Sequence, residues 1–144
     1  MGDTFPAFTC KDQEGKEVTQ RDVMGYPCLL LFFPYAEHVE SLNIAKALLP
    51  YLPDIDEFEA LLIGISPDTS DTHRAMMLKH QLFFPMLTDK NRELAHQCQV
   101  GQGNTLQSAL FLIDEEGTLL WIEKPAQAGG IAERVLDALE IHFG

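Results

Sequence analysis

His38 and Ser41 lie three residues apart, a spacing that puts two side chains on the same face of a helix. Glu37 and Glu40 stand beside them, so this short stretch holds the residue types of a Ser-His-acid hydrolase. Nothing like the Gly-x-Ser-x-Gly turn of many hydrolases surrounds Ser41. We therefore favour a structural interpretation, in which Ser41 caps the first amides of a helix and His38 fills the space beside it.

The three cysteines are the next candidates for chemistry, but their odd number and wide spacing fit neither a Cys-x-x-Cys pair nor a zinc knuckle. Cys28 opens an apolar segment and Cys98 ends a short predicted helix, so we expect both thiols to be buried and unreactive. Cys10 is the best candidate for an exposed thiol. Only Lys11 beside it is basic, and a plain surface or half-buried role is the simpler interpretation.

The histidines do not form a metal-binding pattern. His73 and His80 are seven residues apart, His38 and Glu40 cannot face one site from a regular helix, and no His-Glu-x-x-His sequence occurs. We expect solvated histidines, no metal and no cofactor.

Composition and charge narrow the functional classes. The chain has 144 residues, of which 46% are hydrophobic, which suits one packed domain over residues 1–144. The formal net charge of −12 repels phosphate backbones and anionic lipid headgroups, so we expect neither nucleic acid nor membrane as a partner. There is no apolar run long enough to span a bilayer and no basic leader at the start, which predicts a soluble protein of the cytoplasm.

Hydrophobic periodicity predicts alternating strands and helices. Continuous apolar runs indicate strands that are covered on both faces, at residues 28–33, 60–65 and 109–113. Shorter strands are predicted as a hairpin of residues 8–10 and 17–19, at 85–87, and at 118–122 after a turn over 114–117. Helices are predicted from 39 to about 52, broken by Pro50 and Pro53, and at 71–80, 91–98 and 131–142. The helix at 71–80 carries Ala75, Met76 and Leu78, and a polar loop follows at 101–104. The order indicates an α/β sandwich with a mixed central sheet.

Several short strings in this order resemble the peroxiredoxins, and more narrowly the bacterioferritin-comigratory and one-cysteine bacterial branches of the alkyl hydroperoxide reductase and thiol-specific antioxidant family. They are Gly-Asp-Thr-Phe-Pro-Ala-Phe at 2–8, residues 12–15, Phe-Phe-Pro at 32–34, Gly-Ile-Ser at 64–66, Phe-Pro-Met-Leu-Thr-Asp at 84–89 and Phe-Leu-Ile-Asp-Glu-Glu-Gly at 111–117. The resemblance covers nearly the whole chain and implies a thioredoxin-like fold.

The resemblance also implies a site at the first turn of the helix after Phe-Pro, within a Pro-x-x-x-Thr-x-x-Cys motif. There the helix terminus lowers the pKa of a peroxidatic cysteine, and a threonine and an arginine help to polarise the peroxide. In this chain Pro34 matches the proline, but His38 stands at the threonine position and Ser41 at the cysteine position. Ser108 stands where many relatives have the arginine, and the usual resolving position of this branch is Lys46.

Of the proline, threonine, cysteine and arginine of the family site, this chain retains only the proline. The loss of the other three argues against peroxidase activity, because a serine hydroxyl neither ionises near neutral pH nor forms a sulfenic acid. The first functional interpretation is therefore a degenerate, non-peroxidase binding or regulatory protein, acting through a dimer face or the altered pocket of Pro34, His38, Ser41 and Ser108. The alternative is a thiol-dependent peroxidase, with Ser41 engineered from cysteine or another thiol in use. Relatives commonly dimerise, which makes a homodimer an expected partner state.

Overall fold

The fold is known from a computed structural model, which describes residues 2–100 and 107–144. The described residues form a mixed seven-stranded sheet in the order β2-β1-β5-β4-β3-β6-β7. The strands are β1 (Thr9–Lys11), β2 (Glu17–Thr19), β3 (Cys28–Phe32), β4 (Leu61–Ser66), β5 (Met86–Thr88), β6 (Ala109–Ile113) and β7 (Leu119–Glu123). The parallel pairs are β3 with β4 and β4 with β5, whereas the other neighbours run antiparallel.

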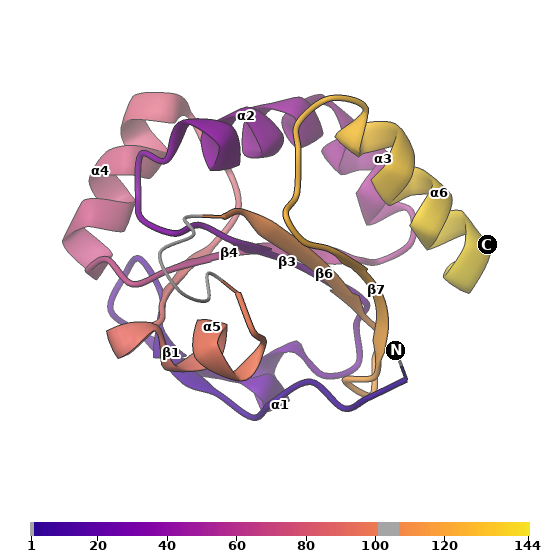
Figure 1. The fold of residues 1–144 in the computed structure, drawn as a ribbon, viewed down its shortest axis with the longest axis horizontal. Coiled ribbons are helices and arrows are strands. Elements are labelled where there is room, and N and C mark those ends of the chain that lie inside the picture. The colour runs from indigo at the N-terminus through magenta and orange to yellow at the C-terminus, as the bar shows by residue number, and fades with distance from the viewer. Residues whose placement is uncertain (1, 101–106) are drawn as a thin grey trace.

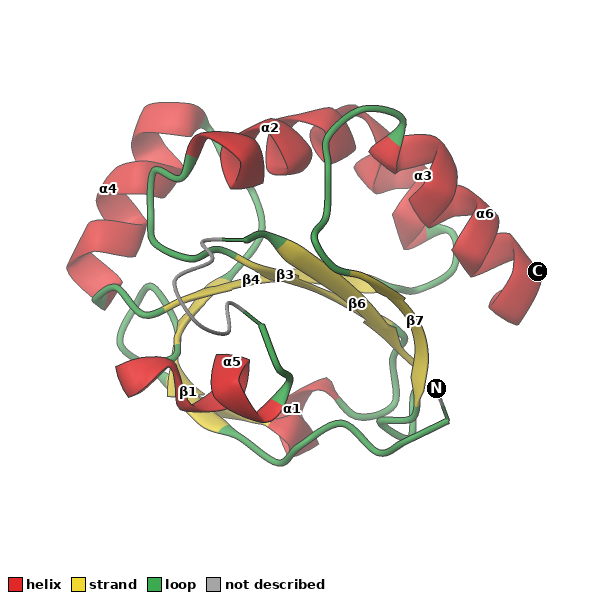
Figure 2. Cartoon of the chain, in the orientation of Figure 1, coloured by secondary structure: helices red, strands yellow, loops and turns green. Residues whose placement is uncertain are grey.

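Helices cover both faces of this sheet (Figures 1 and 2). One face carries α2 (Val39–Leu48), α3 (Leu52–Asp56), α4 (Ser70–His80) and α6 (Ile131–Phe143). The short helices α1 (Gln20–Val23) and α5 (Glu93–Gln97) lie on the other face. The 3-10 turns η1 (Leu49–Tyr51) and η2 (Lys90–Arg92) precede α3 and α5. No helix of the described ranges is long and apolar enough to cross a membrane.

The three predicted buried strands are confirmed as neighbours at the centre of the sheet, in the order β4-β3-β6. All five residues of β3 are buried, because alternate side chains enter different cores. Leu29 and Leu31 belong to the core beneath α2 and α6, whereas Leu30 and Phe32 pack with Phe111 on the opposite face. A continuous apolar run is therefore what this position in the sheet requires.

The hairpin of β1 with β2 and the interruption of the long helix are also confirmed. Pro50 lies in η1 and Pro53 at the start of α3, so the predicted stripe is divided into α2, η1 and α3. The turn before β7 has Gly117 at a φ of 84°, where a side chain would be strained. The polar loop predicted at 101–104 lies outside the described residues.

Three predictions about burial were wrong, those for His73, Cys10 and Cys98. On α4 the inward stripe contains His73 and Met76, whereas Leu78 is 81% exposed and Ala75 is exposed as well. His73 is 0% exposed rather than solvated. Cys10 is buried, because alternation along β1 turns its side chain into the core while its two neighbours face outward. Cys98 is only half-buried.

Candidate functional site

The sequence motif lies where β3 passes into α2. Phe32 ends the strand, Pro34 follows, and His38 is the N-cap of α2, with its side chain accepting a hydrogen bond from the amide of Ser41. The structure thus assigns the capping role to His38, whereas the sequence had suggested Ser41. The cap satisfies one of the amides that a helix terminus leaves unpaired.

Ser41 is 0% exposed, and its hydroxyl joins two residues that the sequence had singled out. Ser41 Oγ lies 2.8 Å from His38 Nδ1 and 2.6 Å from Ser108 Oγ. Ser108, just before β6, is itself only 2% exposed. Three of the four predicted site residues therefore form one hydrogen-bonded group, even though Ser108 is far away in the sequence.

The hydrogen-bond directions in this group can be assigned. His38 Nδ1 accepts the Ser41 amide at 3.3 Å, so it carries no proton and also accepts the Ser41 hydroxyl. The Ser41 oxygen is then free to accept from Ser108. Burial lowers the pKa of His38, with the Glu40 charge opposing, which favours this neutral form. The group is a closed chain of donors and acceptors rather than an activated nucleophile.

Pro34, the fourth predicted site residue, contacts an arginine that sequence reasoning did not identify. Arg92 donates from Nη2 to the carbonyl oxygen of Pro34 at 2.9 Å. No local pattern relates residue 92 to residue 34, so spacing along the chain does not predict this contact. The contact arises because η2 and the loop after β3 come together in the tertiary fold.

The loop between β3 and α2 is anchored by α4 and the segment before it. Asp68 Oδ2 accepts the Ala36 amide at 2.6 Å, and the Met76 sulfur accepts the Glu37 amide at 3.4 Å. Glu37 has a φ of 68°, which is unusual outside glycine, and its carboxylate lies 2.7 Å from His80 Nε2. The hydrogen bond from His80 is the main cause that lowers the pKa of Glu37. These contacts fix the approach of the chain to His38.

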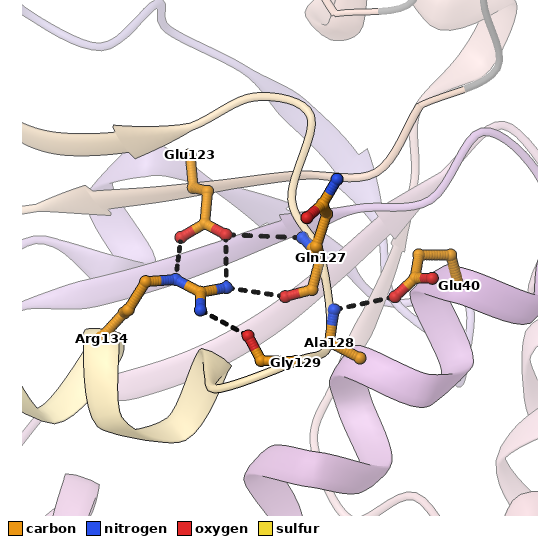
Figure 3. A network of polar contacts seen from close by, with 6 residues as sticks. All are labelled: Glu40, Glu123, Gln127, Ala128, Gly129 and Arg134. Carbon is orange, nitrogen blue, oxygen red and sulfur yellow. Dashed lines mark hydrogen bonds and ion pairs between the residues drawn. The ribbon is translucent and has the colours of Figure 1, made fainter.

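The loop between β7 and α6, residues 124–130, passes over the start of α2 and is called the strap below (Figure 3). Arg134 forms a two-pronged ion pair with Glu123, at 2.9 and 2.7 Å, and also donates to the Gln127 carbonyl at 2.8 Å. The Ala128 amide then donates to Glu40 Oε1 at 2.8 Å. Bidentate arginine pairs are among the stronger ionic contacts, so the strap is held in one shape.

The same strap reaches Ser108 on the other side of the site. The amide of Ala126 donates to the carbonyl oxygen of Ser108 at 2.8 Å. Ser108 is therefore fixed by its backbone as well as by its hydroxyl.

A second Ser-His pair lies beneath α4. Ser66 Oγ is 2.5 Å from His73 Nε2 and 3.3 Å from Asp68 Oδ2. Both Ser66 and His73 are buried, and His73 Nδ1 has no hydrogen-bond partner among the described residues. Burial lowers the pKa of His73, although the Asp68 charge opposes this effect. Neither Ser-His pair presents its hydroxyl to solvent, which removes the structural basis for a hydrolase.

The thiols are not activated. Burial raises the pKa of Cys10 to about 11, with Asp89 and Glu93 adding to the effect. The pKa of Cys28 is raised to about 12 by burial alone, and that of Cys98 to about 12 by burial and Asp89. Within residues 2–100 and 107–144, no group of three or more His, Cys, Asp or Glu side chains could hold a metal ion.

The fold and this helix terminus define a thioredoxin-like protein of the peroxiredoxin type. The sequence model of the AhpC/TSA family matches residues 1–122, so the chain belongs to that family. Its relatives include putative peroxiredoxin Rv2521 of Mycobacterium tuberculosis, 28% identical over 90% of this chain and 87% of that protein. Chloroplastic peroxiredoxin Q of Sedum lineare is 29% identical over 82% of this chain. This chain spans only 65% of that plant protein.

Solved structures support the same fold. A cysteine-to-serine mutant of PrxQ from Xylella fastidiosa matches with a TM-score of 0.90 and 22% identity, over 99% of this chain and 96% of that chain. BcpB from Mycobacterium tuberculosis gives a TM-score of 0.88 and 22% identity, over 97% and 96% of the two chains.

Proposed function

We propose that this peroxiredoxin-family protein does not reduce peroxides and acts instead as a binding or regulatory protein. The observation that carries the proposal is the Ser41 hydroxyl, held between His38 Nδ1 at 2.8 Å and Ser108 Oγ at 2.6 Å. Ser41 occupies the position at which the family motif has its cysteine. A hydroxyl there cannot supply the thiolate, and cannot pass through a sulfenic acid.

The partners of Ser41 favour natural divergence over a single engineered change. A lone Cys-to-Ser substitution in an active peroxidase would leave the threonine and the arginine of the motif in place. In this chain His38 and Ser108 stand at those positions, and both hydrogen-bond to the serine. Such mutual satisfaction of buried polar groups is expected when the positions have changed together.

The alternative function, a peroxidase that uses another thiol, has less support. With pKa values of about 11 and 12, Cys10 and Cys98 would be thiolates at pH 7 in only roughly one molecule in ten thousand or fewer. Cys28 lies in the centre of the sheet with 0% exposure, out of reach of a peroxide.

A binding role would use the surface around the start of α2, because Ser41 and Ser108 are themselves enclosed. Tyr35 is 41% exposed and Val39 is 70% exposed beside the half-buried His38. We propose a homodimer through this surface, in a protein made of one domain. We also propose a cytoplasmic location, which the three unpaired cysteines suit.

The test is peroxide consumption with excess dithiothreitol, measured for the natural chain and for Ser41→Cys. We expect the natural chain to match a heat-denatured control. We expect Ser41→Cys to remain at least about a hundredfold slower than an ordinary family peroxidase, because each missing donor typically costs about a hundred- to a thousandfold in rate.

Two outcomes would overturn the proposal. Rapid turnover by the natural chain that disappears in Cys10→Ser would show that another thiol is the nucleophile. Full family activity in Ser41→Cys would show that the pocket is intact and that the serine is a recent replacement.

A further inference from the structure

A cavity of about 630 Å³ lies away from the Ser41 site, beside the hairpin of β1 with β2. Residues 61–63 at the start of β4 and residues 83–85 before β5 line it, together with parts of α1 and α3. The Ser41 site follows the end of β3, which runs parallel to β4. The two sites therefore lie toward opposite ends of the parallel strands and share no residue.

The walls of this cavity are apolar except at three positions. Ile55 and Leu87, each 1% exposed, form part of its buried floor. Phe83 is a lining residue with 78% of its surface exposed, so it lies at the mouth. A volume of this size is typical of small-molecule pockets, which span about 300–1,000 Å³.

The three polar lining residues are all aspartates, and none of the described Lys, Arg or His residues lines the cavity. Asp12 uses Oδ1 to accept the amides of Glu14 and Lys16, and Asp22 uses Oδ2 to accept the amide of Thr19. These bonds fix two of the carboxylates at the cavity without neutralising them. The carboxylate of Asp56 is exposed and forms no hydrogen bond or ion pair with the described residues.

We propose that this cavity binds a small organic cation with an apolar body, such as an arylalkyl or alkyl amine. The floor would take the apolar body out of water, and the aspartates would face the ammonium group. Phe83 adds an exposed aromatic face of the kind that attracts cations. The net charge of −12 raises the local concentration of cations around the chain.

This inference goes beyond the proposed function at the start of α2, because it concerns a different site and stands on different residues. Ser41→Cys tests the loss of peroxidase chemistry, whereas substitutions at Asp56 and Phe83 test the cavity. Failure of one proposal therefore leaves the other measurable.

The experiment compares three probes of nearly equal shape, 2-(2-naphthyl)ethylamine, 2-(2-naphthyl)ethanol and 2-naphthylacetate. Calorimetry at pH 7 and low salt measures affinity, and amide chemical shifts locate the bound probe. We expect the amine to bind about tenfold or more tightly than the acetate, with the alcohol between them and the affinity of the amine falling as salt is added. The shifted amides should belong to residues 12–23, 52–63 and 83–87.

Substitutions test the contribution of the Asp56 charge to binding separately from any effect on folding. Asp56→Asn should weaken amine binding roughly twofold to fivefold and leave alcohol binding unchanged. Asp54→Asn, an exposed carboxylate on the same helix outside the cavity, is the matched control and should change neither. Phe83→Ala should weaken both probes without a large effect on folding, since its ring is exposed. Equal binding of amine and acetate, absence of amine binding at millimolar concentration, or shifts confined to other residues would overturn the proposal.

Discussion

Two serine-histidine pairs lie in the part of the chain that the structure describes, and their surroundings give them different roles. His38 caps α2 through Nδ1 and shares Ser41 with Ser108, so the polar atoms at the contact are paired. His73 meets Ser66 at 2.5 Å but is 0% exposed, and its Nδ1 has no partner among the described residues. The same two residue types therefore provide a satisfied cap at a helix terminus in one place and a pH-sensitive group within the core in the other.

We expect the largest loss of stability when the space that His73 fills beneath α4 is emptied. His73→Ala removes a fully buried ring and one partner of Ser66, and should lower the free energy of unfolding by about 2–4 kcal/mol. His38→Ala should cost less, about 0.5–2 kcal/mol, because it removes a half-buried cap. Urea denaturation with unchanged m-values measures both, and a greater cost at His38 would reverse the ranking.

Removing the Ser41 hydroxyl should lower the unfolding free energy more than removing the Ser108 hydroxyl does. Ser41→Ala leaves the buried Ser108 hydroxyl with no partner, at a cost of about 1–3 kcal/mol in unfolding free energy. Ser108→Ala leaves Ser41 bound to His38, and should cost about 0.5–1.5 kcal/mol. The double variant completes the thermodynamic cycle. Additive costs would mean that the two hydroxyls are not coupled.

Mild acidification should destabilise the fold through His73. Burial lowers its pKa in the folded protein below the ordinary value of 6.5, so below pH 6.5 the unfolded chain binds more protons than the folded one. The stabilisation is complete above pH 6.5 and declines as the pH falls from there toward the lowered pKa. His73→Gln, which cannot titrate, should flatten this part of the curve more than His38→Gln does. Parallel curves for the natural chain and His73→Gln would contradict the assignment.

The smallest expected effect tests whether the N-cap hydrogen bond of His38 contributes to the free energy of unfolding. Asparagine is among the best N-cap residues, so His38→Asn should retain the unfolding free energy to within about 0.5 kcal/mol. Thermal unfolding of His38→Asn beside His38→Ala measures the difference. If both variants lose the same stability, the ring contributes through packing against Tyr35 rather than through its hydrogen bond.

Sequence periodicity was reliable where one side chain after another had to be apolar, as in β3 and β6. On α4 it located the helix, but it did not reveal that His73 is buried and that Leu78 is 81% exposed. A hydrophobicity pattern assigns histidine to solvent, whereas a hydrogen bond to Ser66 makes its burial tolerable. Cys10 was misplaced because a strand of three residues is too short to show which face is covered.

The sequence by itself determined the central strands, the position of Ser41 at the start of a helix and the family to which the chain belongs. These features follow from local spacing, from uninterrupted apolar runs and from short strings in a fixed order. Only the tertiary structure decided that Ser108 meets Ser41 and that Arg92 reaches Pro34. It also placed His73 in the core and formed the cavity lined by Asp12, Asp22 and Asp56. Such contacts join residues that are distant in the chain, and they depend on strand order, register and helix rotation, which local patterns do not specify.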